Sequence, residues 1–131
     1  EARLQAIHAR MHTLLEAAGA HLDGVYFCPH HPDAGCVCRK PATRLVDRAV
    51  VELGLDLSTS YMIGDQKRDV DLARAVGARS LLVQTGPTSR QALEVMQAEG
   101  YAPDRVVSSL VEAVEWILAD AAKRTSAEVI K

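Results

Sequence analysis

Short apolar runs alternate with segments of helical periodicity along most of the chain. The runs that suit buried strands are Gly24–Phe27, Ser60–Ile63, Ser80–Gln84 and Arg105–Val107. Apolar residues recur at helical spacing in Leu4–Ala18, Pro41–Leu53, Val70–Val76, Ser89–Ala98 and a last segment that Ser109 can cap. Strands that alternate with helices form parallel sheets covered on both faces, so this order predicts an α/β fold with a mostly parallel sheet.

The length and charge of the chain narrow the class of protein. At 131 residues we expect a single domain over 1–131, whose last helix frays after Lys123. Fifteen basic against seventeen acidic residues give a net charge of -2, which disfavours binding to a nucleic-acid backbone. No apolar run approaches the roughly 18 residues of a membrane span, and EARLQAIHARMH has no signal-peptide character. A cytoplasmic protein, without membrane contact and monomeric, is the expectation. The buried face of the last helix is predicted to consist of Leu110, Val111, Val114, Ile117 and Leu118.

The loop CPHHPDAGCVCRKP interrupts all periodicity and gathers the three cysteines of the chain. Three thiolates and one imidazole complete the tetrahedral coordination of a zinc ion and leave no coordination position open. This arrangement predicts a structural zinc site over 28–40. The alternatives are buried apolar cysteines with a surface histidine, or a redox pair of Cys36 and Cys38. His31 is a spare histidine, either an alternative ligand or a solvated residue. The predicted ligands are Cys28, His30, Cys36 and Cys38.

A second group of polar residues follows the strand that ends at Gly64. Asp65 lies at the carboxyl end of this strand, and Asp69 comes about one helical turn later. Magnesium prefers a few carboxylate oxygens together with water and phosphate, which makes Asp65 its candidate ligand. The plainer alternative is that both carboxylates serve only as turn, cap or helix-dipole residues. Ligands of parallel sheets bind at the carboxyl ends of the strands, so the Cys28 loop and the Thr85–Gly86 turn could join the same site.

Two basic residues directly follow the predicted zinc ligands. Lys40 lies between the loop and the helix that Pro41 begins, so it is held at a defined place. A lysine there can neutralise charge on a transferring phosphoryl group, and Arg39 beside it adds a second cation. The alternative is a solvated surface lysine.

The segments CPHHPDAGCVCRKP, SYMIGDQKRD and LLVQTG resemble the heptose bisphosphate phosphatases. These enzymes form a zinc-containing branch of the haloacid dehalogenase superfamily that is closely related to histidinol phosphatases, and the similarity runs from about Ile7 to Leu118. The resemblance implies a Rossmann-like three-layer α/β/α fold and magnesium-dependent hydrolysis of a sugar phosphate monoester through an aspartyl-phosphate intermediate. It also implies that Arg39 and Lys40 contact the substrate phosphate, that Asp65 binds magnesium and that Asp69 supports the turn by hydrogen bonding.

The chain departs from the family pattern in two places. Gln66 stands where the family often has a basic, substrate-contacting residue, a loss for which Lys67 could compensate. The family also carries a D-x-D motif on a strand in the middle of the sheet, and none precedes the zinc loop here. Asp69-Val70-Asp71 lies inside a predicted helix and cannot replace it. We therefore expect this chain to be the C-terminal portion of a longer enzyme, with the first strands missing, and to be inactive alone.

Two other functions stay open at the level of sequence. Histidinol-phosphate phosphatase shares the zinc loop and differs mainly in the substrate pocket, although LLVQTG and DRVVSSLVEAV favour the heptose enzyme. A non-catalytic zinc module is the alternative from another class, and the acidic net charge counts against it.

Overall fold

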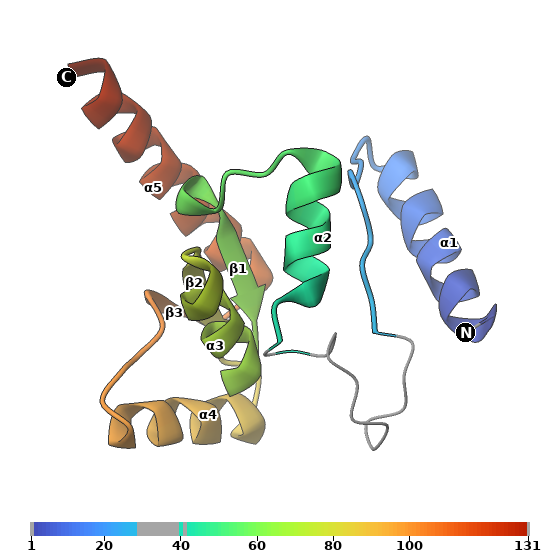
Figure 1. Cartoon of the computed structure of the whole chain (residues 1–131). Coiled ribbons are helices and arrows are strands. Elements are labelled where there is room, and N and C mark those ends of the chain that lie inside the picture. The colour runs from blue at the N-terminus through green and yellow to red at the C-terminus, as the bar shows by residue number, and fades with distance from the viewer. Residues whose placement is uncertain (1, 29–39, 41, 131) are drawn as a thin grey trace. The chain divides into compact units, whose positions relative to one another are not determined.

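The computed structural model of the chain describes residues 2–28, 40 and 42–130 (Figure 1). The chain divides into two compact units, Glu1–Leu55 and Asp56–Lys131, called here the N-terminal and the C-terminal unit. The single domain over 1–131 stays a prediction. Within the described residues, no helix combines the length and the apolar character that crossing a bilayer requires.

A parallel sheet of three strands forms the centre of the C-terminal unit. Its strands are β1 (Tyr61–Gly64), β2 (Arg79–Val83) and β3 (Arg105–Val107), paired in the order β1-β2-β3. Parallel neighbours need a crossover connection, which α3 (Lys67–Val76) supplies between β1 and β2 and α4 (Pro87–Ala98) between β2 and β3. The three predicted strands in this unit are confirmed, with ends shifted by at most one residue.

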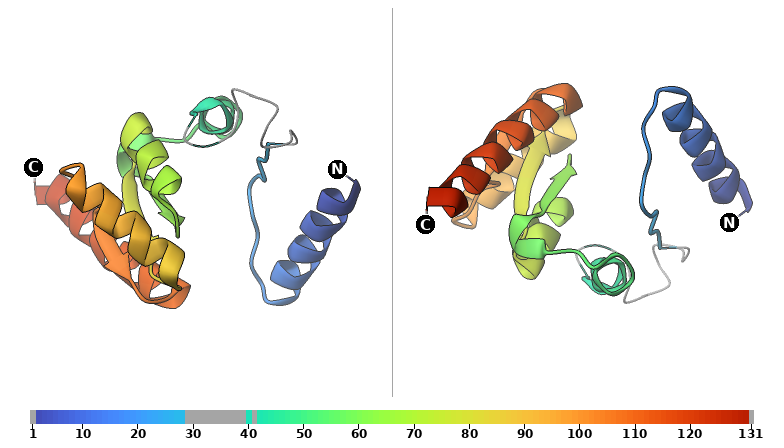
Figure 2. Two further views of the ribbon diagram at one scale, coloured as in Figure 1. Left: turned by 90° about the horizontal axis from the view of Figure 1, so that it is seen from below. Right: turned by 90° about the horizontal axis from the view of Figure 1, so that it is seen from above.

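Side chains of β2 alternate between two apolar clusters, one on each face of the sheet. Leu82 packs with residues of α3 and α4, namely Val70, Ala92 and Met96. Leu81 and Val83 pack on the opposite face with Val107 and with Ala113 of α5 (Leu110–Ile130). The right-hand view of Figure 2 shows α5 on one side of these strands and α3 on the other. The predicted three-layer α/β/α arrangement is thus confirmed in this unit.

The helices α3 and α4 each begin earlier than the apolar periodicity indicates. α3 begins at Lys67 and ends before Gly77, whose φ of 79° is the left-handed conformation that glycine adopts readily. α4 begins at Pro87, and the buried Ser89 hydroxyl accepts from the Thr85 and Gly86 amides at 3.1 and 3.3 Å. Periodicity misses such first turns because they carry no apolar side chains at helical spacing: α3 begins with Lys67-Arg68-Asp69 and α4 with Pro87-Thr88.

The predicted buried face of α5 is wrong for four of its five residues and confirmed for Ile117. Leu110, Val111, Val114 and Leu118 are 61%, 69%, 45% and 66% exposed, whereas Ala113 is fully buried and Trp116 and Ile117 pack beside it. The stretch LVEAVEWIL has apolar residues over most of the helix circumference, with Glu112 and Glu115 on the remaining side, so spacing alone does not select which part of this wide apolar face is buried. The side that contacts the sheet decides which one is buried. α5 extends to Ile130, beyond Lys123, where the sequence predicts that the helix begins to fray. The Ser109 hydroxyl caps its start by accepting from the Glu112 amide at 3.1 Å.

The N-terminal unit contains two helices, α1 (Ala2–Ala17) and α2 (Arg44–Leu53), with an irregular segment after α1. The predicted strand Gly24–Phe27 is wrong for the described structure, because a strand requires a hydrogen-bonded neighbour and none pairs with it there. The segment instead contacts both helices through side chains. The Tyr26 hydroxyl donates to Glu52 at 3.0 Å, and the Phe27 ring lies 5.2 Å from the ring of His8.

The helix predicted from Pro41 begins three residues later, at Arg44. The Asp47 amide donates to the Thr43 carbonyl at 2.8 Å, which is the first bond of the helix. The Thr43 hydroxyl also donates to the Asp47 carboxylate at 2.9 Å. α2 ends before Gly54, whose φ is 66°.

Candidate functional site

The turn between β1 and α3 carries the candidate magnesium ligand. β1 ends at Gly64, the Asp65 side chain is exposed, and Gln66 has an extended backbone with φ of -127° and ψ of 157°. β1 and β2 are parallel neighbours, so this turn and the Thr85–Gly86 turn after β2 lie at the same edge of the sheet. The structure therefore brings two of the three predicted site segments to one edge.

Asp69 holds this turn from inside the unit. Its side chain is buried with 6% exposure, and its Oδ2 accepts from the Gln66 amide at 3.1 Å, while its own amide donates to the Gln66 carbonyl. The Asp69 carboxylate lies so close to Gly64 that a Cβ at position 64 would fall 2.3 Å from its carboxyl carbon. Only glycine leaves room for this arrangement. Asp69 thus contacts the turn by the hydrogen bond that the family resemblance implies.

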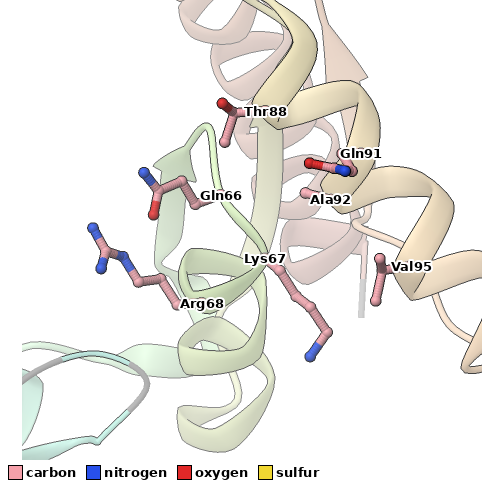
Figure 3. Close-up of a pocket in the computed structure, with 7 residues that line it drawn as sticks. All are labelled: Gln66, Lys67, Arg68, Thr88, Gln91, Ala92 and Val95. Atoms are coloured by element: carbon pink, nitrogen blue, oxygen red, sulfur yellow. The ribbon is translucent and has the colours of Figure 1, made fainter.

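Lys67 does not take the place of a basic residue at Gln66 in this arrangement. Its ammonium is 2.9 Å from Asp71 Oδ2 and 3.4 Å from Glu99 Oε2. In Figure 3 its side chain extends away from those of Gln66 and Arg68. The hydrogen bond to Asp71 is the main cause that raises the pKa of Lys67, so the ammonium is charged at neutral pH and is already paired with Asp71 and Glu99. Arg68 stays exposed beside the turn.

The partners of Lys67 form a polar cluster that sequence reasoning missed. The Tyr101 hydroxyl donates to Asp71 Oδ1, and the Arg74 guanidinium lies 4.0 Å from the centre of the Tyr101 ring. Burial raises the pKa of Asp71, but the hydrogen bonds from Tyr101 and Lys67 outweigh burial and lower it overall. Burial and then the bond to Asp71 raise the pKa of Tyr101. The i,i+4 spacing of Lys67 and Asp71 is visible in the sequence. Nothing there points to Tyr101, which is 30 residues from Asp71.

A groove of about 360 Å³ runs beside the turn, between the start of α3 and one side of α4 (Figure 3). It is polar where it adjoins the turn and apolar further along α4. The residues that line it are Gln66, Lys67, Arg68, Thr88, Gln91, Ala92 and Val95.

Of the residues predicted around the zinc loop, the structure describes two. Cys28 is half-buried, and Lys40 is exposed. His30, Cys36, Cys38 and Arg39 lie outside the described residues, so the zinc site and the Arg39 contact stay predictions. Among the residues that are described, no three His, Cys, Asp or Glu side chains gather closely enough to hold a metal ion.

The sequence of the chain matches a known family of hydrolases. Residues 37–113 match the family model described as HAD-hydrolase-like. This stretch begins at Val37, inside the predicted zinc loop, and covers the Gly64–Gln66 turn and all three strands.

Several curated relatives are named as heptose-1,7-bisphosphate 7-phosphatases. The D-glycero-D-manno-heptose-1,7-bisphosphate 7-phosphatase of Thermosynechococcus vestitus is 42% identical over 132 residues, which cover 92% of this chain and 67% of that protein. The D-glycero-beta-D-manno-heptose-1,7-bisphosphate 7-phosphatase of Bordetella bronchiseptica is 37% identical, and the match covers 92% of this chain and 65% of that protein. The enzyme of that name from Pseudomonas putida is 38% identical, and the match covers 68% of this chain and 51% of that protein. The chain therefore spans about half to two thirds of the length of these relatives.

Solved structures agree with this relationship. The crystal structure of the D,D-heptose 1,7-bisphosphate phosphatase from B. bronchiseptica, complexed with magnesium and phosphate, matches with a TM-score of 0.76 and 36% identity. The match covers 91% of this chain and 65% of that one. The p-nitrophenyl phosphatase from Archaeoglobus fulgidus matches with a TM-score of 0.50 and 38% identity, over 58% of this chain and 30% of that one. The chain thus belongs to the HAD-like hydrolases, within the family of the heptose-1,7-bisphosphate 7-phosphatases.

Proposed function

We propose that the complete protein containing this chain hydrolyses a sugar phosphate monoester, and that its substrate is the 7-phosphate of heptose 1,7-bisphosphate. The observation that carries the proposal is the 42% identity to a relative of that name over 92% of the chain. The likeness to the B. bronchiseptica enzyme, solved with magnesium and phosphate, adds support from the fold.

Asp65 is the proposed magnesium ligand of this chain. Its carboxylate is exposed at the carboxyl edge of the sheet, and hard carboxylate oxygens are the donors that magnesium prefers, so the residue fits the ion. When bound, magnesium would neutralise negative charge on the phosphoryl group. Asp69 contributes by holding the Gln66 amide, and so the backbone that follows Asp65, in one position.

Arg39, Lys40 and Gln66 are the proposed contacts of the substrate phosphate. Two fixed cations stabilise the negative charge of a phosphoryl group in transfer, and Gln66 can donate a hydrogen bond but supplies no charge. In the proposed mechanism the first aspartate of a D-x-D motif outside these 131 residues attacks the phosphorus atom. The bond from phosphorus to the sugar oxygen breaks, and the leaving sugar oxygen takes a proton from the second aspartate of the motif. A water then hydrolyses the resulting aspartyl phosphate.

Cys28, His30, Cys36 and Cys38 are proposed to hold a structural zinc ion. Three thiolates and an imidazole suit tetrahedral zinc and leave no position for substrate. The ion would order a loop with no periodic apolar pattern and thereby place Arg39 and Lys40, which follow it. We further propose that the protein is a cytoplasmic monomer that binds neither nucleic acid nor membrane.

A comparison of substrates on the complete gene product tests the proposed activity. We expect magnesium-dependent phosphate release from heptose 1,7-bisphosphate to exceed that from histidinol phosphate. Asp65→Asn should lower the rate at least about 100-fold, because it removes one anionic metal ligand. Asp56→Asn serves as the matched control, because this exposed aspartate caps a short helix at the other end of β1. Faster hydrolysis of histidinol phosphate would reassign the substrate, and absence of any phosphatase activity would favour a non-catalytic zinc module.

A further inference from the structure

We propose that Lys67 is a positioning residue, whose clamp by Asp71, Glu99 and Tyr101 holds the Gly64–Gln66 turn in the geometry that binds magnesium. The inference rests on the proposed function, because it assigns a structural cause to the placement of Asp65. It goes beyond that function because it gives Lys67 a structural role and no contact with the substrate.

The Lys67 ammonium connects three parts of the C-terminal unit. It is 2.9 Å from Asp71 Oδ2 within α3, 3.4 Å from Glu99 Oε2 just after α4, and 5.7 Å from the centre of the Tyr101 ring. The side chains of Lys67 and Asp71 are only 34% and 26% exposed, so water competes less with this pair than with a surface ion pair. The first turn of α3 is thereby attached to the segment that follows α4.

The far end of the clamp is anchored in the core. Both carboxylate oxygens of Asp71 are used, Oδ1 by the Tyr101 hydroxyl and Oδ2 by Lys67. The Tyr101 amide donates to the Met96 carbonyl at 3.0 Å, and its ring packs against the apolar cluster that contains Val70 and Met96. A contact made to such a fixed group restricts Lys67 more than a contact to a mobile surface side chain.

The clamp adjoins the turn directly. Lys67 is the first residue of α3 and directly follows Gln66. The Gln66 amide donates a hydrogen bond to the Asp69 carboxylate. On the other side of the turn, β1 is held by its ladder to β2. Asp65 therefore lies between two fixed points, and release of Lys67 frees one of them.

The charges around Lys67 favour positioning over phosphate binding. A lysine at the first position of a helix is repelled by the positive end of the helix dipole. Asp71 and Glu99 offset this repulsion and also neutralise the charge that a phosphate would need. Figure 3 shows the side chain directed away from Gln66, the proposed phosphate contact.

Two variants separate positioning from substrate contact. Lys67→Met removes the ammonium and keeps an unbranched apolar stem, whereas Tyr101→Phe removes only the hydroxyl that holds Asp71 and leaves the lysine charge in place. Asp120→Asn is the matched control. Asp120 accepts from Tyr61 at 2.6 Å and from Arg79 at 2.7 Å, so it joins α5 to the opposite, amino ends of β1 and β2.

The experiment makes two measurements on the complete gene product. The first is amide hydrogen exchange at Gln66 and Asp69 without substrate or metal, and the second is the magnesium concentration for half-maximal activity. Both variants should speed exchange at these amides, with Lys67→Met about five-fold faster than wild type and Tyr101→Phe less. Both variants should also raise the magnesium concentration for half-maximal activity, Lys67→Met more than Tyr101→Phe. The KM for substrate at saturating magnesium should stay at the wild-type value. Asp120→Asn should lower Tm but leave both quantities at the wild-type value.

Equal exchange at Gln66 in Lys67→Met and Asp120→Asn would overturn the proposal. A rise in substrate KM for Lys67→Met, with none for Tyr101→Phe, would also overturn it and make Lys67 a substrate contact. Should Lys67→Met fail to fold, Tyr101→Phe decides by the same two measurements. A wild-type protein without phosphatase activity would refute the proposed function, while the exchange data would still decide whether the clamp holds the turn.

Discussion

At the scale of single residues, the Gly64–Gln66 turn depends on close packing between a glycine and a carboxylate. Asp69 is buried against Gly64 and accepts from the Gln66 amide. The carboxylate that orders the turn therefore leaves no space for a side chain at position 64. Asp71 lies two residues further along α3 and is held by two donors of its own.

Gly64→Ala should destabilise the C-terminal unit by about 1–3 kcal/mol, because the new methyl group would overlap the Asp69 side chain. Urea unfolding of the chain measures this change. Gly86→Ala is the control, since a Cβ at that glycine meets no atom within 4 Å and its φ of 170° is open to any residue. Equal stability of the two variants would contradict the packing that we describe.

The stability that Asp71 contributes should depend on pH. Its pKa is lower in the folded than in the unfolded state, so the contribution is complete above the unfolded value of about 3.9. It is lost as the pH falls through the folded pKa. Between pH 6 and pH 3, Asp71→Asn should therefore lose less unfolding free energy than wild type, in urea titrations at both pH values. An identical loss in the two proteins would show that Asp71 does not contribute.

At the scale of elements, contact with the sheet decides which side of α5 is buried. Ala113 lies between Leu81, Val83 and Val107, while Val111 is 69% exposed. A small residue at position 113 lets the helix axis approach the sheet closely. The apolar residues on the outer side of α5 have no such role within the C-terminal unit.

Ala113→Leu should therefore destabilise this chain by about 1–3 kcal/mol through overpacking. Val111→Gln, two residues away, should change the unfolding free energy by less than about 0.5 kcal/mol. Both values can be measured by urea unfolding of the chain followed by circular dichroism. A larger loss for Val111→Gln than for Ala113→Leu would restore the face predicted from periodicity.

At the scale of the whole molecule, the proposed zinc ion would order the loop that joins the apolar segment before Cys28 to α2. Purified protein should contain one zinc ion per chain, and Cys36→Ser should lower this content because three ligands bind zinc more weakly than four. Elemental analysis measures the content, and Tm before and after chelation measures the contribution to stability. Val37→Ser is the control, because it changes the same loop without removing a ligand. A zinc-free protein, or an unchanged Tm after chelation, would contradict the site.

Local sequence was sufficient for much of the fold. The runs before Gly64 and Gln84, the glycine after α3 and the serine before α5 act through neighbouring residues, so strands and helix ends followed from the chain itself. The zinc-loop segment, the segment around Asp65 and LLVQTG together indicated the family for the same reason, because the residues of each segment are contiguous.

Contacts between distant segments were decided only by the tertiary structure. Spacing could not select the buried part of α5, because its apolar face is wider than the side that contacts the sheet. Nor could it assign Lys67, whose partners Glu99 and Tyr101 are brought to α3 by the crossover through β2 and α4. The sequence determines the chemistry of each side chain. Whether that side chain contacts substrate or another side chain depends on which segments the fold places beside it.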